Sequence, residues 1–179
     1  ANTTASNNTA VGKAALGACT TGDYNTAVGH AALDAVTTGN RNTAVGTFAL
    51  TSNTGSYNVA LGMYALNQNT SGQFNVGIGY AALDANTTGE YNIAIGYEAL
   101  KTNTGSNGNT AVGHYALRLN TGAKNTAMGT NAGTAISTGV ENTVVGYNAL
   151  DDCTGGGENT AVGEQALTSV TTGSNNTAV

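Results

Sequence analysis

The sequence predicts an all-β protein, a parallel β-solenoid built from about ten coils of 17 residues each. Three observations lead to this prediction: one motif recurs along almost the whole chain, one glycine is fixed in every unit, and the apolar segments are four or five residues long, which is strand length. We expect residues 1–179 to be a single repeat array. Because the chain begins with Ala1 and stops within a motif at Val179, we also expect it to be a fragment of a longer protein.

The repeated unit has the consensus N-T-A-V-G-x-x-A-L-x-x-x-T-T-G-x-x, with successive units 16 or 17 residues apart. Helical repeats are too large for this spacing, because two helices and their turns need more than about 30 residues. One lap of chain with two or three short strands fits instead. Stacking the laps in register places equivalent residues about 4.8 Å apart and makes a rod about 50 Å long. The motif begins at Asn8, Asn25, Asn42, Asn58, Asn75, Asn92, Asn109, Asn125, Asn142, Asn159 and Asn176.

The fifth position of the unit is always glycine, between two short apolar runs. A fixed glycine at such a place predicts a backbone corner that needs a positive φ or a close approach of another backbone segment. A Thr-Gly or Ser-Gly step later in each unit predicts a second corner. The corner glycines are Gly12, Gly29, Gly46, Gly62, Gly79, Gly96, Gly113, Gly129, Gly146 and Gly163.

The strand after each motif asparagine has two faces, because side chains alternate. Positions two and four carry Thr and Val, or Ile93 and Ile95 in one unit, while position three is nearly always Ala. We expect the larger side chains to point into the coil, against the conserved Leu column, and the small Ala and Gly face to point outward. A strand that is apolar on both faces is buried on both faces. We therefore expect a homotrimer, with the small face at the contact between chains.

Two segments carry a resemblance to known proteins. Residues 25–33 (NTAVGHAAL) and 92–100 (NIAIGYEAL) resemble the head repeats of YadA-like trimeric autotransporter adhesins, and resemble still more the repeat arrays of phage tail-fibre and tail-fibre-domain proteins. The resemblance spans residues 7–179. It implies a left-handed parallel β-roll, a homotrimeric fibre, and an extracellular location on a cell surface or a virion.

Aromatic residues fall into two columns, one just before the motif asparagine and one just after the corner glycine. Exposed rings of this kind bind sugar rings or another protein surface, so the columns are a candidate recognition ladder. The alternative is that ring stacking only stabilises the solenoid. The candidate residues are Tyr24, Tyr57, Phe74, Tyr91, Tyr80, Tyr97 and Tyr147. The unbroken asparagine column, by contrast, is expected to bond along the rod and to have a structural role.

Charge and spacing argue against other functions. The net charge is −5 with only five basic residues, so we expect no nucleic-acid partner. No apolar run is long enough for a membrane helix. The acids are scattered without a catalytic pair, and no metal or cofactor motif is present, so we expect no enzyme, metal or cofactor. Cys19 and Cys153 are eight coils apart, too far for a disulfide within one chain.

The sequence thus favours a structural fibre or surface-display element, a tail-fibre shaft or an adhesin head, that gives a rigid trimeric rod for attachment to a surface glycan or protein receptor. Shaft and head are both left open. One alternative is an ice-binding solenoid, which would use a threonine ladder; that column holds Thr9, Thr26, Thr43 and Thr110 but is interrupted by Val59, Val76 and Ile93. The other alternative is a fibre-borne polysaccharide depolymerase.

Overall fold

A computed structural model describes residues 4–179 and shows one three-residue strand in each complete repeat, with a shorter one at the end. The two or three strands of four or five residues expected per lap are therefore reduced to one. Each strand begins directly after the motif asparagine and ends before the corner glycine. The strands are β1 (Thr9–Val11), β2 (Thr26–Val28), β3 (Thr43–Val45), β4 (Val59–Leu61), β5 (Val76–Ile78), β6 (Ile93–Ile95), β7 (Thr110–Val112), β8 (Thr126–Met128), β9 (Thr143–Val145), β10 (Thr160–Val162) and β11 (Thr177–Ala178).

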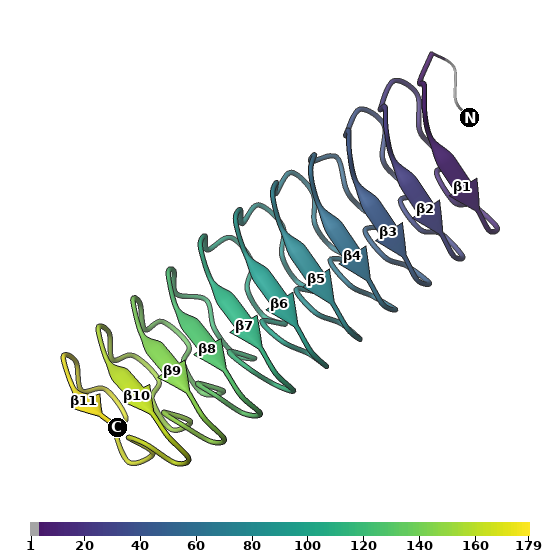
Figure 1. Cartoon of the computed structure of the whole chain (residues 1–179). Coiled ribbons are helices and arrows are strands. Elements are labelled where there is room, and N and C mark those ends of the chain that lie inside the picture. Colours follow the sequence, from purple (N-terminus) through teal and green to yellow (C-terminus); the bar gives the residue numbers. More distant parts are fainter. Residues whose placement is uncertain (1–3) are drawn as a thin grey trace.

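The strands form a single parallel sheet whose order follows the chain from β1 to β11 (Figure 1). Equivalent repeat positions pair with each other; Val59 pairs with Val76, and Val76 with Ile93. Residues 4–179 contain no helix. The prediction of an all-β parallel solenoid, with one lap for each repeat, is confirmed. Strands β1 and β11 lie at opposite ends of the rod (Figure 1).

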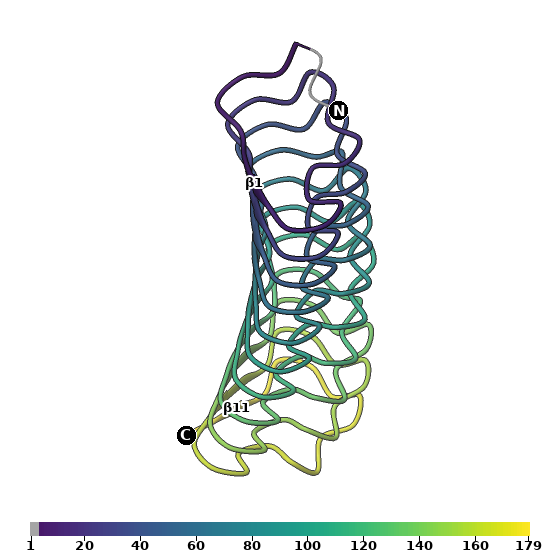
Figure 2. The same cartoon turned by 90° about the vertical axis from the view of Figure 1, so that its right-hand side faces the viewer.

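The rest of each lap consists of tight turns that also stack in register. Leu33 donates its backbone N–H to the carbonyl of Ala49 at 3.0 Å, and Leu50 repeats this contact with Ala65 one coil later. In side view the strands lie along one wall of the rod and the folded turns along the opposite wall (Figure 2). Backbone hydrogen bonds between coils therefore run through the turns as well as through the sheet.

The expected orientation of the strand was wrong. The middle residue, such as Ala60 or Ala94, is fully buried, while positions two and four point outward; Val59 is 38% exposed and Leu61 is 46% exposed. The larger Thr and Val side chains therefore do not fill the coil. The small Ala column faces the interior, and it is not the outward face for contact with another chain.

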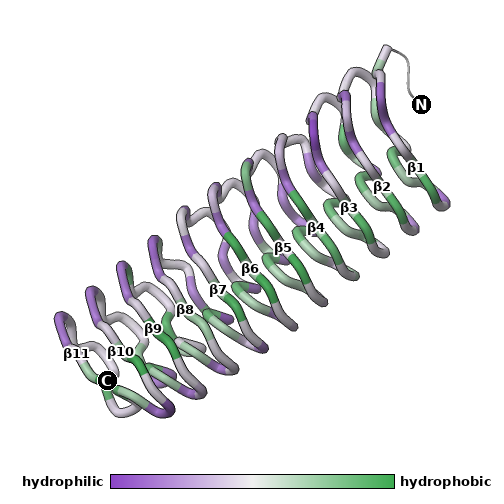
Figure 3. Tube along the Cα trace, viewed as in Figure 1, coloured by the Kyte–Doolittle hydropathy of each residue, from purple (hydrophilic) through white to green (hydrophobic). Residues whose placement is uncertain are grey.

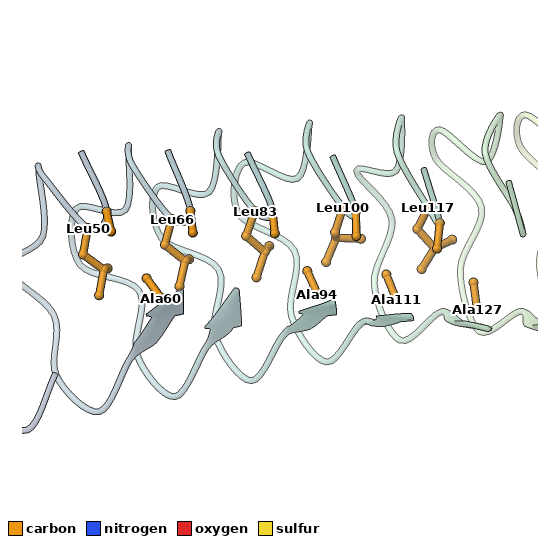
Figure 4. Packing of buried hydrophobic residues seen from close by; sticks show 14 of the residues in the cluster. Leu50, Ala60, Leu66, Leu83, Ala94, Leu100, Ala111, Leu117 and Ala127 are labelled. Carbon is orange, nitrogen blue, oxygen red and sulfur yellow. The ribbon is translucent and has the colours of Figure 1, made fainter. Parts of the chain in front are cut away.

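The core explains this orientation. The Leu column projects from the turn wall toward the strand alanines, so each layer holds one Leu opposite one Ala (Figure 4). The space is small: a methyl group on Gly77, which replaces Ala in β5, would lie 3.2 Å from Cγ of Leu66. A lap of 17 residues encloses too little volume for two large columns facing Leu.

The corner glycines have the predicted geometry. Their φ angles lie between 123° and 140°, a region that residues with a side chain rarely adopt. A methyl group on Gly62 would also lie 2.5 Å from the carbonyl oxygen of Gly79 in the next coil. At the Thr-Gly step the reason is different: Gly39 has no positive φ, but its Cα faces the carbonyl of Gly55 too closely for a side chain.

The Leu column has a backbone conformation that the sequence did not reveal. Leu33 has a φ of 51° and Leu66 a φ of 50°, in the left-handed region. This conformation costs about 1–2 kcal/mol for a residue with a side chain, and complete burial of the Leu side chain offsets it by about 1.5–3 kcal/mol. Gly133 replaces Leu once in this column, also at positive φ, and the side chain of Ile136 occupies the space.

Candidate recognition surface

The first aromatic column forms a continuous stack. The ring of Phe74 lies 4.9 Å from that of Tyr57 and 5.1 Å from that of Tyr91, with interplanar angles of 11° and 1°. Each ring residue has a positive φ, which points its side chain outward at the corner. The rings therefore cover each other's faces within the stack and present their edges to solvent.

Arg41 extends the same stack toward the N-terminus. Its guanidinium lies 5.4 Å from the ring centroids of both Tyr24 and Tyr57, and it donates a hydrogen bond to the Tyr57 hydroxyl at 2.9 Å. A planar cation between two aromatic faces is a favourable cation–π arrangement. Arg41 stands directly before the motif asparagine Asn42, in the same sequence column as the rings, and its part in the stack was not predicted.

The second aromatic column follows the corner glycine and is less regular. Contacts run from His30 to Phe48, Tyr64, Tyr80, Tyr97, His114 and Tyr115, with centroid distances from 3.9 to 6.1 Å. Some pairs stack and others meet edge to face. Within residues 4–179, Tyr147 forms no ring contact. Of the seven predicted ladder residues, six thus belong to two rows and one stands apart.

A charged cluster, which was not predicted from the sequence, lies beside this second aromatic column. The side chain of Glu98 is only 9% exposed and forms ion pairs with Lys101 at 2.7 Å and Arg118 at 2.8 Å. Burial raises the pKa of Glu98, but the two cations outweigh it and hold this pKa below its ordinary value. Arg118 also lies over the Tyr115 ring, 4.7 Å from its centroid. The cluster could have been found only from the stacking of positions seven and ten in adjacent units.

Asp84 lies beside this cluster, and one oxygen of its carboxyl lacks a hydrogen bond. Its Oδ1 atom is buried without a hydrogen-bond partner in the described part of the chain. Burial raises the pKa of its carboxyl, and the nearby Asn67 and Lys101 offset only part of that effect. A buried carboxylate oxygen without a partner destabilises the folded state when the group is ionised.

The outward strand face is a flat surface made of two columns. Position two holds Thr in most coils and Val59, Val76 or Ile93 in the middle of the array, while position four holds Val, Leu, Ile or Met. Apolar residues run along β4, β5 and β6 (Figure 3). The position-four column therefore forms a partly exposed apolar stripe along the sheet, which Val59, Val76 and Ile93 widen in β4, β5 and β6. Exposed apolar surface of this kind makes the strand face a candidate interaction site.

The motif asparagines have the structural role that the sequence predicted. Asn42 donates its side-chain N–H to the carbonyl of Gly55 at 2.9 Å, while its Oδ1 accepts the backbone N–H of Asn58 at 2.9 Å.

A second, fully buried amide column was missed. Four members bond side chain to side chain, as in Asn69 to Asn53 at 2.6 Å, and they are Asn53, Asn69, Asn86 and Asn103. Asn120, in the same column, instead accepts a hydrogen bond from the side chain of Asn125 at 3.1 Å. These asparagines can be recognised in the sequence by their spacing. Each lies two or three residues before the residue whose backbone carbonyl it bonds, which is the glycine of the Thr-Gly or Ser-Gly step in four units and Ser106 in the fifth.

The remaining reactive groups lie apart from one another. Cys19 and Cys153 are free and fully buried, so the prediction that they do not bridge within the chain is confirmed. Among residues 4–179 no group of His, Cys, Asp and Glu could hold a metal ion, and no pocket opens on the surface. Nor does this part of the chain include a helix that is long and apolar enough to cross a membrane.

The fold defines the chain as a tandem-repeat β-solenoid with an apolar strand face and stacked aromatic edges. No known protein family, curated protein or solved structure matches it. The geometry of its own residues is therefore the basis for proposing a function.

Proposed function

We propose that this chain forms a rigid, left-handed trimeric rod, a fibre shaft or adhesive head, that serves surface attachment at a cell surface or on a virion. The supporting observation is the apolar stripe on the outward strand face. Val59, Leu61 and Ile95 are each more than a third exposed in the single chain. Covering them with two further copies removes this surface from water at about 25 cal/mol per Å².

The trimer contact proposed here differs from the one expected from the sequence. The Ala column is already buried in the coil, so the Thr and Val columns must face the neighbouring chains. A parallel arrangement about one axis would then place the two aromatic columns on either side of each contact. Stiffness would follow from the ladders of backbone hydrogen bonds in every coil.

Cross-linking tests the trimer contact. Cys19 and Cys153 are first replaced by Val, the residue that Val36 and Val170 already provide in the same column. Ile95→Cys, on the strand face, should then give covalent dimers with a short bis-maleimide, whereas the exposed Thr70→Cys on the turn wall should not. Equal cross-linking at both positions, or none at either, would contradict the proposed contact.

A second experiment separates shaft from head. Replacing Tyr57, Phe74 and Tyr91 together with Ser removes the central stack while leaving the coil interior intact. Loss of binding to candidate glycans or host surfaces assigns this array the role of a receptor-binding head. Unchanged binding assigns it the role of a shaft.

Ice binding is a second candidate, favoured by one specific observation. The threonine column expected to point inward points outward, and it is uninterrupted from Thr110 through Thr126, Thr143 and Thr160 to Thr177. The neighbouring column of Val, Leu, Ile and Met is irregular in size, which suits packing against another chain better than an ice lattice. A freezing assay decides: thermal hysteresis supports ice binding, and its absence removes this candidate.

A further inference from the structure

The stack of Tyr57, Phe74 and Tyr91 ends abruptly at Gly108. This glycine occupies the next position of the same column and brings no side chain. Its backbone is nevertheless in register, because its N–H donates to the carbonyl of Glu90 at 3.1 Å. One face of the Tyr91 ring is therefore uncovered, and Tyr91 is the most exposed ring of the stack, at 60%.

The column continues one coil beyond the gap with Lys124. Lys124 donates its backbone N–H to Asn107 at 3.1 Å, and its ammonium bonds to Glu141 in the following coil at 2.9 Å. This bond draws the ammonium of Lys124 away from Gly108, toward the following coil. A methyl group on Gly108 would meet one atom within 4 Å, Cγ of Lys124 at 3.8 Å.

The dimensions of this gap match one flat ring. Tyr91 and Lys124 are two coils apart, about 10 Å. A ring midway between them would lie at the spacing of about 5 Å that Phe74 keeps from its two neighbours. Arg41 shows that this column accepts a planar group other than an aromatic ring between two neighbours.

Charge selects among planar ligands. Arg41 has a ring on each side, whereas a guanidinium beside Gly108 would have the cation Lys124 as one neighbour and be repelled by it. A neutral aromatic ring suits both neighbours, because one face stacks on Tyr91 and the other packs against the methylene stem of Lys124, whose Cγ is the atom nearest to this position.

We propose that the gap at Gly108 binds an aromatic ring, supplied by a Phe, Tyr or Trp side chain of a partner protein. The inference goes beyond the attachment function and does not depend on the trimer. The partner would insert one ring edge-on and extend the stack of this chain by one step.

Titration with N-acetyl-tryptophan amide tests the proposal by NMR. The expected result is a saturable shift of the Gly108 amide and the Tyr91 ring signals, larger than at Asn175, which lies in the same column with no ring beside it. Gly108→Phe fills the gap with the chain's own ring and should weaken binding at least about tenfold. Its backbone suits this change, because φ is 70° at Gly108 and 58° at Tyr91.

Two matched variants complete the test. Tyr91→Ala should abolish the shift at Gly108, and Ala tolerates this backbone, since Ala31 has a φ of 52°. Tyr24→Ala, at the other end of the stack, should leave the shift unchanged. The proposal is overturned if the Gly108 shift survives Tyr91→Ala, if the Tyr91 ring shift survives Gly108→Phe undiminished, or if methyl glucopyranoside shifts Gly108 more strongly, which would assign a sugar ring to the gap.

Discussion

Asn92 donates its backbone N–H to Oδ1 of Asn75 at 3.0 Å, across the step from one coil to the next. The same Asn75 side chain donates its amide to the carbonyl of Gly89 at 2.7 Å, within its own lap. Each motif asparagine, at the start of a lap, is thus hydrogen-bonded both to the end of that lap and to the start of the next one. The Gly89 carbonyl also accepts the side-chain amide of Asn86 at 3.1 Å, whereas within residues 4–179 the Asn92 N–H bonds to Asn75 alone.

Asn75→Ala should therefore destabilise the rod strongly. It leaves the Asn92 N–H buried without a partner, at a cost of about 1–3 kcal/mol, while the Gly89 carbonyl keeps its bond from Asn86. Guanidinium denaturation should show a loss of about 1–3 kcal/mol in the free energy of unfolding. Gln68→Ala is the control, because Gln68 is exposed in a neighbouring lap. Equal stability of the two variants would argue against the amide column as a main source of stability.

Leu83→Ala tests the thin core. Leu83 is fully buried opposite the strand alanines, and removing its side chain leaves a cavity that the stacked neighbours cannot close. The free energy of unfolding should fall by about 2–5 kcal/mol. The matched variant Leu119→Ala, on a residue that is 44% exposed, should change it by about 0.5 kcal/mol or less. Similar losses in both variants would mean that Leu83 does not form the core.

Gly62→Ala tests the corner. A methyl group there would require a φ of 133° and would meet the carbonyl oxygen of Gly79 at 2.5 Å, so the two coils would have to separate. We expect loss of the cooperative thermal transition, or a large fall in its midpoint, by circular dichroism. Gly155→Ala should unfold like the parent protein, because its nearest atom, Oγ1 of Thr138, is at an ordinary 3.5 Å.

Asp84→Asn should stabilise the protein at neutral pH. The pKa of Asp84 is raised in the folded state, mainly by burial, so the ionised carboxyl destabilises folding at pH values above that pKa. As the pH falls through the folded pKa toward the ordinary value of 3.8, the parent protein takes up a proton and recovers this stability. The gain in stability of Asp84→Asn over the parent protein should therefore be largest near pH 7 and should vanish in acid.

Comparing the parent protein with the Asp84→Asn variant isolates the effect of Asp84 ionisation on stability. Glu98 has a lowered pKa and loses its contribution as the pH falls through that value, but it does so in parent and variant alike. Urea denaturation across the acid range measures the difference directly. A difference that is constant with pH would show that ionisation of Asp84 does not destabilise the fold.

Spacing alone was enough to predict the solenoid, because stacking in register is the one arrangement that repeats every 17 residues with a glycine at each corner. The face of the strand could not be predicted the same way. Both faces lacked charge, and side-chain size favoured placing Thr and Val inside. The signal was the near-uniformity of the Ala column, from which only Gly77 and Val144 depart. Small side chains such as Ala60 and Ala94 face Leu in a thin core, whereas Leu61 and Ile95 vary freely because they lie outside.

The candidate site was predicted in part. Stacking of Tyr57, Phe74 and Tyr91 followed from their shared column. The ion pairs of Glu98 were missed, because they join residues three and twenty positions away, and the conformation of a turn decides whether those residues meet. The left-handed conformation of Leu66 was likewise hidden, since burial rather than local preference maintains it.

Sedimentation equilibrium of the purified chain at micromolar concentration tests the proposed rod most directly. If the Thr and Val columns cover one another around an axis, the particle mass should be three times the 17.7 kDa of one chain, and Ile95→Lys should reduce it. A species of 17.7 kDa at every concentration, unchanged by that substitution, would contradict the account.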